Sequence, residues 1–254
     1  MPAHRVSFPG SRGAELAARL EFPEGEIEAF CLFAHCFTCG KDIAAAARLG
    51  TGLTRAGYAV LRFDFTGLGH SGGEFASTNF SSNVDDLLAA SDWLAEHHRA
   101  PALLVGHSLG GAAALAAAPR IDACRAVATL GAPADPGHVE HLLGDSADRI
   151  EREGEVELTL AGRAFTIRRQ FLEDLRAASF RDTLGDLGRA LLIMHSPTDS
   201  IVGIENAERI YTAARHPKSF LSLDGADHLL TRREDAAFAA SVLGAWARRY
   251  VRQA

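Results

Sequence analysis

A serine near the middle of the chain lies between small residues at a spacing that suits nucleophilic catalysis. The run Gly106-His107-Ser108-Leu109-Gly110 follows an apolar stretch and precedes an alanine-rich one. Between a strand and a helix, this G-x-S-x-G pattern holds a serine on a tight turn with its hydroxyl exposed. The helix start also directs backbone N–H groups toward a developing oxyanion. We therefore predict Ser108 as a nucleophile; the alternative is a glycine-rich turn with an unused serine.

A histidine near the carboxyl end of the chain supplies the base that such a serine requires. A serine hydroxyl is a weak nucleophile until a neighbouring base takes its proton. His228 lies in the run GADHLL at 225–230, after the last predicted strand and before the last predicted helix. Parallel sheets present their sites on loops at the carboxyl ends of strands. We predict His228 as the base; the alternative is a histidine that only caps a helix or fills a loop.

A carboxylate must hold the histidine in the correct tautomer and stabilise its charged form. Asp199 follows the apolar run ALLIMH at 190–195 and lies between the serine and the histidine in sequence. The order serine, aspartate, histidine is one of the known chain orders for this chemistry. Asp227 adjoins the histidine and could not easily reach back to its Nδ1, Asp224 closes the last predicted strand, and Asp135 is a stronger rival because it also follows a strand. We predict Asp199 as the orienting acid.

Short apolar runs alternate with helical patterns along the chain, and this alternation predicts the elements that position these residues. It indicates a mostly parallel eight-stranded sheet with helices on both faces, in which the first two strands form an antiparallel edge hairpin. The predicted strands are 5–8, 16–22, 29–34, 58–65, 102–106, 126–130, 190–195 and 219–223, and the predicted helices are 43–56, 82–97, 108–118, 204–214 and 235–251.

One segment interrupts this alternation. Between 136 and 187 a charged helix-like stretch at 140–153 precedes two alternating runs, 156–160 and 164–167, which flank Ala161-Gly162. Alternating runs around such a turn predict a β-hairpin. We interpret 136–187 as an inserted cap, and residues 1–135 together with 188–254 as the core domain.

Five motifs together resemble the α/β-hydrolase family, and the resemblance covers essentially the whole chain. They are HCFTCGKD at 35–42, RFDFTGLGHSGG at 62–73, GHSLGG at 106–111, HSPTDSIV at 195–202 and GADHLL at 225–230. The chain resembles small bacterial esterases of the cinnamoyl (feruloyl) type and the hydrolase domain of bacterial hydrolase–OsmC fusion proteins. The resemblance implies an α/β-hydrolase fold in which the backbone N–H groups of Phe37 and Leu109 form the oxyanion hole. Cys36 stands where these esterases have glycine.

Two cysteines lie on this oxyanion loop. Cys36 and Cys39 form a C-x-x-C pattern, and Cys31 and Cys124 complete the set of 4 cysteines. So few cysteines do not make a disulfide scaffold and suit a reducing compartment. The simpler interpretation of the pair is two small residues that pack a loop. The alternative is a redox-active pair that changes the shape of the oxyanion loop.

Composition excludes several classes of protein. The chain has 254 residues, 47% of them hydrophobic, with a net charge of −6 and no apolar run near the length of a membrane span. An acidic balance without a basic face argues against nucleic acid as a partner. Without a secretory signal, we expect a cytoplasmic location. A homodimer is possible, and the predicted chemistry needs neither a metal nor a cofactor.

These observations predict a serine hydrolase with a two-step acyl-enzyme mechanism. We expect small-molecule carboxylic esters with short-chain or aromatic acyl groups as substrates. Because fold does not fix substrate, a thioesterase or another acyl hydrolase on the same triad is the first alternative. The alternative of another class is a non-catalytic or redox-sensing protein that keeps this fold and uses the Cys36/Cys39 pair.

Overall fold

Eight strands form one sheet in the computed structural model, which describes residues 2–160, 162–178 and 184–252. The strand order is β1-β2-β4-β3-β5-β6-β9-β10, and all neighbours are parallel except the pairs β1–β2 and β2–β4. The predicted sheet and its antiparallel edge hairpin are therefore confirmed. The strands are β1 (Ala3–Pro9), β2 (Glu15–Glu21), β3 (Ala29–Ala34), β4 (Tyr58–Phe63), β5 (Leu103–His107), β6 (Ala126–Leu130), β9 (Ala190–His195) and β10 (Lys218–Ser222).

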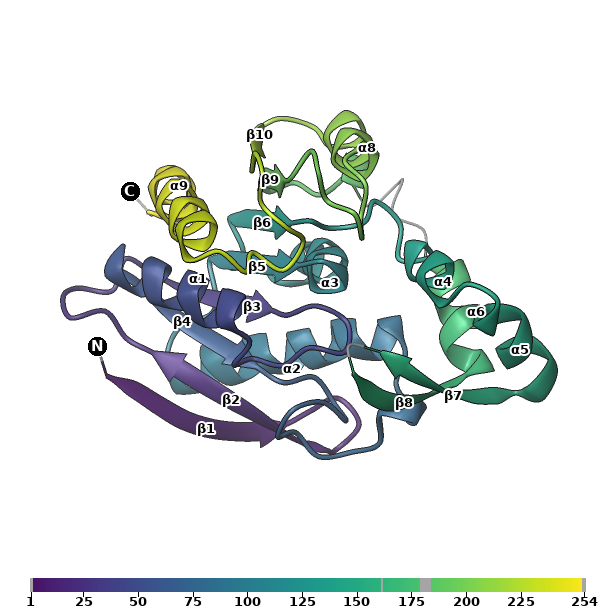
Figure 1. Cartoon of the computed structure of the whole chain (residues 1–254). Helices are drawn as coiled ribbons and strands as arrows, with labels where there is room; N and C mark the ends of the chain where they lie inside the picture. The colour runs from purple at the N-terminus through teal and green to yellow at the C-terminus, as the bar shows by residue number, and fades with distance from the viewer. Residues whose placement is uncertain (1, 161, 179–183, 253–254) are drawn as a thin grey trace.

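Helices cover both faces of the sheet, so every residue of its five central strands is buried. One face packs against α1 (Ala44–Arg55) and α9 (Arg233–Val251), and Figure 1 shows these two helices side by side. The other face packs against α2 (Phe80–His97), α3 (Leu109–Ala117) and α8 (Glu205–Ala213). Two short turns, η1 (Phe75–Ser77) and η2 (Ala118–Arg120), complete this core. Within the described ranges, none of the helices has the length and apolar character needed to cross a membrane.

The long helix α2 begins two residues earlier than the sequence predicts, because a reciprocal cap fixes its start. The side chain of Asn79 accepts the backbone N–H of Ser82 at 2.8 Å, and the Ser82 hydroxyl accepts the backbone N–H of Asn79 at 2.9 Å. Together these bonds satisfy two donors that a helix end would leave open. The helix therefore starts at a definite residue, at the end of the segment that follows β4.

The segment predicted as a cap lies beyond the carboxyl end of the sheet (Figure 1). Its β7 and β8 pair antiparallel as a hairpin, while Ala161 of the predicted turn and residues 179–183 lie outside the described residues. The prediction of one helical stretch over 140–153 is wrong, because Gly144 adopts a positive φ of 52° and divides it into two helices. The elements are α4 (His138–Leu143), α5 (Ser146–Glu153), β7 (Glu155–Leu160), β8 (Arg163–Arg168) and α6 (Arg169–Ala177).

Aromatic rings join this cap segment to the core. The ring of Phe171 on α6 stacks on Phe37 with centroids 5.2 Å apart, and Phe165 on β8 lies 4.8 Å from Phe75 on η1. The rings of Phe37 and Phe75 are also neighbours, 5.7 Å apart. Aromatic pairs at these distances stabilise beyond the area they bury. The segment predicted as a cap therefore packs directly against the loop that follows β3.

Candidate active site

Ser108 occupies a strained turn between β5 and α3. Its backbone has φ 55° and ψ −128°, a combination that residues with a Cβ rarely adopt. Its N–H donates to the carbonyl of Leu130 at 2.8 Å, so the turn is tied to the end of β6. Such strain persists only where the surrounding structure enforces it, and it concentrates at functional sites. The predicted nucleophile therefore lies on a turn of the kind that exposes a serine hydroxyl above a sheet.

Close backbone packing enforces this turn. A Cβ on Gly106 would lie 2.3 Å from the carbonyl oxygen of Gly110, inside the turn itself. A Cβ on Gly110 would lie 2.3 Å from the carbonyl oxygen of His35 and 2.5 Å from that of Ala34. Both positions therefore require glycine, as the G-x-S-x-G pattern indicates. The second contact also places the start of α3 directly against the loop that follows β3.

His228 and Asp199 form a hydrogen-bonded pair. Nδ1 of His228 lies 2.7 Å from Oδ2 of Asp199, and the two side chains are 8% and 2% exposed. The other carboxylate oxygen accepts the backbone N–H groups of Ile201 at 2.9 Å and Val202 at 3.0 Å. Because the carboxylate accepts the Nδ1–H, the imidazole keeps a lone pair on Nε2. That nitrogen is the one that can take a proton from a nucleophile.

The environment of Asp199 keeps its carboxylate charged. Burial alone would raise its pKa, but hydrogen bonds from His228 and from the backbone N–H groups of Val202 and Ile201 outweigh burial and lower the pKa below its ordinary value. Hydrogen bonds to the charged form favour that form. An ionised Asp199 fixes the tautomer of His228 and stabilises the imidazolium that would form during proton transfer.

The rival carboxylates have other partners. The Asp227 side chain accepts the backbone N–H of Thr231 at 2.8 Å, although it adjoins His228 in sequence. Asp135 accepts the backbone N–H of Gly137 at 2.8 Å, and Asp224 accepts the hydroxyl of Ser222 at 2.5 Å. These short-range bonds are typical of turns. Among the four carboxylates that the sequence offered, the structure brings Asp199 to the histidine.

The serine turn and the histidine loop meet at the end of β6. His107 donates from Nε2 to the carbonyl oxygen of His228 at 2.7 Å, and the two rings are 4.9 Å apart. A Cβ on Gly131 would lie 3.2 Å from Nδ1 of His228, and the preceding residue Leu130 accepts the N–H of Ser108. The three predicted residues therefore converge on one small region at the carboxyl end of β5, β6 and β9.

Phe37 and Leu109, the implied oxyanion donors, line the same narrow cavity. Leu109 is the first residue of α3, where a backbone N–H has no acceptor within the helix. In the described part of the chain, neither the Phe37 nor the Leu109 N–H has a hydrogen-bond acceptor. Such open N–H groups are the donors that an oxyanion requires. The cavity is also lined by His35, Cys36, Phe65, Leu68, Asn83, Gly110 and Ala113.

Cys36 and Cys39 are joined by a disulfide, so they are more than two small residues packing a loop. Their Cα atoms are 5.3 Å apart, and the Cys39 N–H donates to the Cys36 carbonyl at 3.2 Å. The ring they close contains Phe37 and Thr38, whose φ is 63°. Cys31 and Cys124 are free and buried, and burial raises the pKa of Cys124 to about 12. The disulfide therefore constrains the residue that carries one implied oxyanion donor.

Two buried histidines beside the site were not singled out from the sequence. His107 ends β5 and holds the backbone of the His228 loop, as described above. His195 ends β9 and donates from Nε2 to the carbonyl of Val202 at 2.7 Å, which closes the loop that carries Asp199. Burial, with His228 close by, lowers the pKa of His107 to about 4, so this ring is neutral. The available sequence signal was a histidine at the last position of an apolar strand, with a candidate residue following within four positions: Ser108 directly after His107, and Asp199 four residues after His195.

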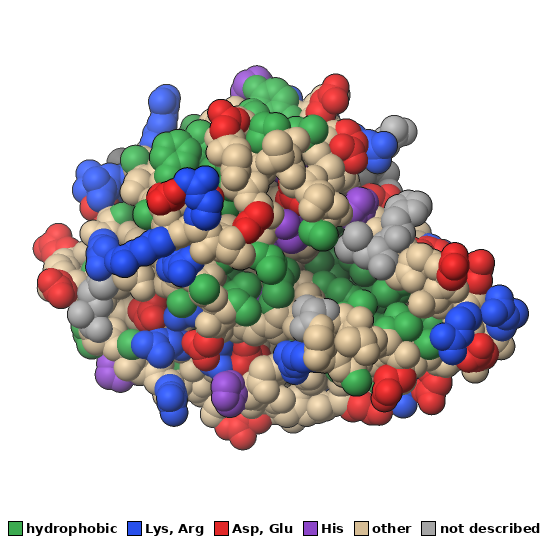
Figure 2. Space-filling model, viewed as in Figure 1, with side chains coloured by type: hydrophobic (Ala, Val, Ile, Leu, Met, Phe, Trp, Pro, Cys, Tyr) green, Lys and Arg blue, Asp and Glu red, His purple; other side chains and the backbone are tan. Residues whose placement is uncertain are grey.

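Figure 2 shows a hollow on one face of the molecule, with hydrophobic side chains gathered along it. Two exposed hydrophobic residues lie close to the acid and the base in sequence: Ile201, two residues after Asp199, is 44% exposed, and Leu229, directly after His228, is 47% exposed. Concave sites lined by apolar groups with a few convergent polar atoms are typical of small-molecule binding.

The sheet order, the serine turn after β5 and the aspartate and histidine loops after β9 and β10 define an α/β-hydrolase. Residues 25–150 match the model of a family described as serine aminopeptidase, S33. The esterase domain of a Rhodothermus marinus protein is 50% identical, with a TM-score of 0.80 over 99% of this chain and 100% of that chain. The chain therefore belongs to the α/β-hydrolase family.

More distant solved structures share the fold. Est1E from Butyrivibrio proteoclasticus, solved with ferulic acid bound, is 20% identical and has a TM-score of 0.77, over 94% of this chain and 97% of that chain. Alpha/beta hydrolase domain-containing protein 10 from mouse is 21% identical, with a TM-score of 0.78 over 96% of this chain and 98% of that chain. A comparison with curated proteins gives no significant match.

Proposed function

We propose that this protein is a serine hydrolase that cleaves carboxylic esters of short-chain or aromatic acids. The observation that carries the proposal is the 2.7 Å hydrogen bond between His228 and Asp199, next to the strained turn that holds Ser108. A base, its orienting acid and a serine on such a turn are the parts that acyl transfer requires. The esterase domain at 50% identity supports ester bonds as the target.

In the proposed mechanism, Nε2 of His228 takes the proton of Ser108 as its hydroxyl oxygen attacks the ester carbonyl. The N–H groups of Phe37 and Leu109 hold the negative oxygen of the tetrahedral intermediate. The imidazolium, stabilised by Asp199, then protonates the leaving alcohol, which leaves an acyl group on the serine. The same histidine activates water, which attacks the acyl-enzyme and releases the acid.

The expected substrates follow from the apolar character of this face of the molecule. Figure 2 shows hydrophobic side chains gathered in a hollow, and the ring of Phe37, which carries one implied oxyanion donor, contacts the rings of Phe75 and Phe171. An apolar acyl group gains free energy when such a surface removes it from water. The ferulic acid bound to Est1E is an aromatic acid on a similar fold, which supports aromatic esters as candidates.

The test is a panel of p-nitrophenyl esters of increasing chain length, with methyl ferulate and acyl thioesters, on the wild type and on Ser108→Ala. We expect turnover that Ser108→Ala abolishes, and covalent labelling of the wild type alone by a fluorophosphonate. Faster cleavage of thioesters than of matched oxygen esters would identify a thioesterase on the same triad. Wild-type protein that neither turns over nor becomes labelled would overturn the enzymatic proposal and favour a non-catalytic role.

The disulfide favours a second candidate function, a hydrolase whose activity changes when the Cys36–Cys39 bond is reduced or oxidised. A dithiol would reduce the Cys36–Cys39 bond to two thiols and be oxidised to a disulfide, and a peroxide would reverse the change and yield water. Reduction opens the ring around Phe37, so we expect kcat to fall by about 10²-fold, the scale of losing one oxyanion donor.

Dithiothreitol and then hydrogen peroxide, applied to the wild type and to Cys39→Ser, test this candidate. The wild type is expected to lose and regain turnover, and Cys39→Ser to remain at one rate throughout. Cys124→Ser is the matched control, because Cys124 is a free and buried thiol away from the loop, and it should respond like the wild type. A wild-type rate that neither reagent changes would remove the candidate.

A further inference from the structure

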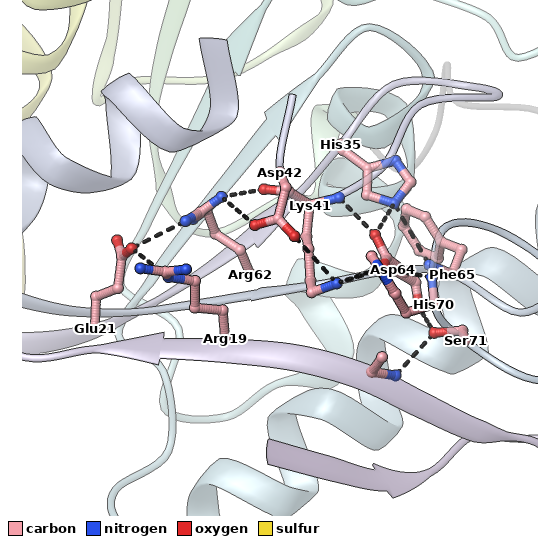
Figure 3. Close-up of polar contacts among 11 residues, drawn as sticks. Arg19, Glu21, His35, Lys41, Asp42, Arg62, Asp64, Phe65, His70 and Ser71 are labelled. Carbon is pink, nitrogen blue, oxygen red and sulfur yellow. Dashed lines mark hydrogen bonds and ion pairs between the residues drawn. The ribbon is translucent and has the colours of Figure 1, made fainter. Parts of the chain in front are cut away.

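A buried aspartate at the end of β4 binds the end of the loop that carries Phe37. The carboxylate of Asp64 accepts the backbone N–H of Lys41 at 2.6 Å on one oxygen and the Lys41 ammonium at 2.7 Å on the other (Figure 3). It also accepts the backbone N–H of His70 at 2.9 Å. Asp64 is 1% exposed and Lys41 6% exposed, so the ion pair lies almost entirely out of water.

The start of the same loop is bound from the same strand end. The backbone N–H of Phe65, the residue after Asp64, donates to Nε2 of His35 at 3.4 Å. The other ring nitrogen of His35 donates to the carbonyl of Cys36 at 2.9 Å. Arg62 donates to the carbonyl of Lys41, and its guanidinium also pairs with Glu21 on β2 at 2.9 Å. Figure 3 shows one continuous network that includes Glu21, Arg62, Lys41, Asp64 and His35.

The surrounding backbone is shaped to fit this carboxylate. A Cβ on Gly69, which has a φ of 55°, would lie 2.3 Å from the Asp64 carboxyl group. A Cβ on Gly40 would lie 3.1 Å from the same group. Burial alone would raise the pKa of Asp64, but hydrogen bonds from the Lys41 ammonium and from the backbone N–H groups of His70 and Lys41 lower it. Removing one partner of a buried ion pair is costly, because the other charge is left unpaired.

We propose that Asp64 is a positioning residue, which sets the oxyanion hole by fixing the residues on both sides of Phe37. His35 and Lys41 are the fixed ends, and the disulfide ring between them contains Phe37, which lines one cavity together with Leu109. The assignment rests on the proposed hydrolase function. Asp64 does not touch the reacting atoms. It acts on one end of the loop by binding the backbone of Lys41, and on the other end through its neighbour Phe65, which binds His35.

Asp64→Asn tests the proposal, with Asp86→Asn as its matched control. An amide has one acceptor oxygen, so its NH₂ group would face at least one of the N–H donors that now bind Asp64. Asp86 is equally buried and accepts four hydrogen bonds, from the backbone N–H and hydroxyl groups of Ser11 and Thr66. It therefore tests for the loss of a buried carboxylate that does not bind the oxyanion loop.

We expect Asp64→Asn to lower kcat by about 10²-fold, because a displacement near 1 Å at a catalytic group costs that much. KM should stay within roughly threefold, since the oxyanion forms only in the transition state. Asp86→Asn should lower the urea midpoint yet keep the wild-type kcat. Equal values of kcat in the two variants, at a temperature where both are folded, would overturn the proposal.

Hydrogen exchange of the peptide that contains residues 36–41 gives a readout independent of turnover. Exchange in this peptide should increase in Asp64→Asn and stay at the wild-type rate in Asp86→Asn. Faster exchange in Asp64→Asn with an inactive wild type would remove the hydrolase proposal but keep Asp64 as the anchor of the loop. Unchanged exchange in Asp64→Asn would overturn that anchoring role, whatever the wild type hydrolyses.

Discussion

The ring of His107 donates a hydrogen bond from Nε2 to the backbone carbonyl of His228, with the two atoms 2.7 Å apart. His107 immediately precedes Ser108, so one side chain links the turn that carries the predicted nucleophile to the loop that carries the predicted base. The Nδ1 atom of His107 is buried without a hydrogen-bond partner in the described structure, which fits an unprotonated nitrogen. The ring of His107 is neutral in this link, because a proton on Nδ1 would create a buried N–H donor without an acceptor.

This link predicts a loss of stability in mild acid. Burial, with His228 near, lowers the pKa of His107 from 6.5 to about 4, so below pH 6.5 the unfolded chain takes up a proton that the folded chain does not. The free energy of unfolding is therefore full above pH 6.5 and falls as pH drops toward 4, by at most about 1.4 kcal/mol per pH unit from this group. Urea unfolding between pH 4.5 and 7.5 measures the slope.

His107→Gln tests the assignment of that slope. The glutamine amide can still donate to the carbonyl of His228 but takes up no proton, so the variant should lose about 1 kcal/mol per pH unit of the dependence. Part of the slope should remain, because burial also lowers the pKa of His35. His4→Gln is the control, since His4 is exposed on β1, and it should keep the wild-type slope. If the free energy of unfolding of His107→Gln depends on pH as steeply as that of the wild type, the acid sensitivity comes from other titratable groups.

Contact between Gly110 and the oxyanion loop gives a second prediction. The Cβ of Gly110→Ala would meet two backbone carbonyl oxygens at 2.3 and 2.5 Å, and backbone atoms cannot rotate away as a side chain can. We expect a loss of about 3 kcal/mol in the free energy of unfolding, larger than the gain in helix propensity. Gly25→Ala should be neutral within about 0.5 kcal/mol, because nothing lies within 4 Å of its added Cβ.

Urea midpoints of both glycine variants give this comparison. Gly110→Ala should also lose turnover beyond its loss of stability, because the strain would push the start of α3 away from His35. A midpoint for Gly110→Ala close to that of Gly25→Ala would mean that the turn and the loop are not packed as the structure has them.

Periodicity predicted the sheet and its helices because wholly apolar runs mark strands that are covered on both faces. The runs at 29–34 and 190–195 coincide with β3 and β9, residue for residue. Helix α2 starts at Phe80 rather than at residue 82, since the cap made by Asn79 is a side-chain contact that periodicity does not register. The sequence predicts one charged, helix-like stretch over 140–153, but the positive φ of Gly144 divides this stretch into two helices.

The candidate site was predictable where residue type and chain order restrict the choice, as for Ser108, Asp199 and His228. Contacts between distant residues were not. The ion pair of Lys41 with Asp64 spans 23 positions, and each residue alone resembles an ordinary surface charge. The C-x-x-C spacing left open whether Cys36 and Cys39 are bonded, because spacing does not set the geometry of the loop between them.

Asp199 and Asp227 both lie close to His228, one through a hydrogen bond and the other in sequence, and the choice between them gives the sharpest prediction about catalysis. Asp199→Asn keeps an oxygen that can accept the backbone N–H groups of Ile201 and Val202, but its amide can no longer hold His228 as an ionised acceptor does. With the wrong tautomer favoured, kcat should fall by about 10⁴-fold while the fold persists. Asp227→Asn removes the carboxylate that adjoins His228 in sequence but accepts its hydrogen bond from Thr231. In this variant kcat should stay within roughly threefold of the wild-type value. Steady-state kinetics on a p-nitrophenyl ester decide between them, and a larger loss in Asp227→Asn would transfer the role of orienting acid to that residue.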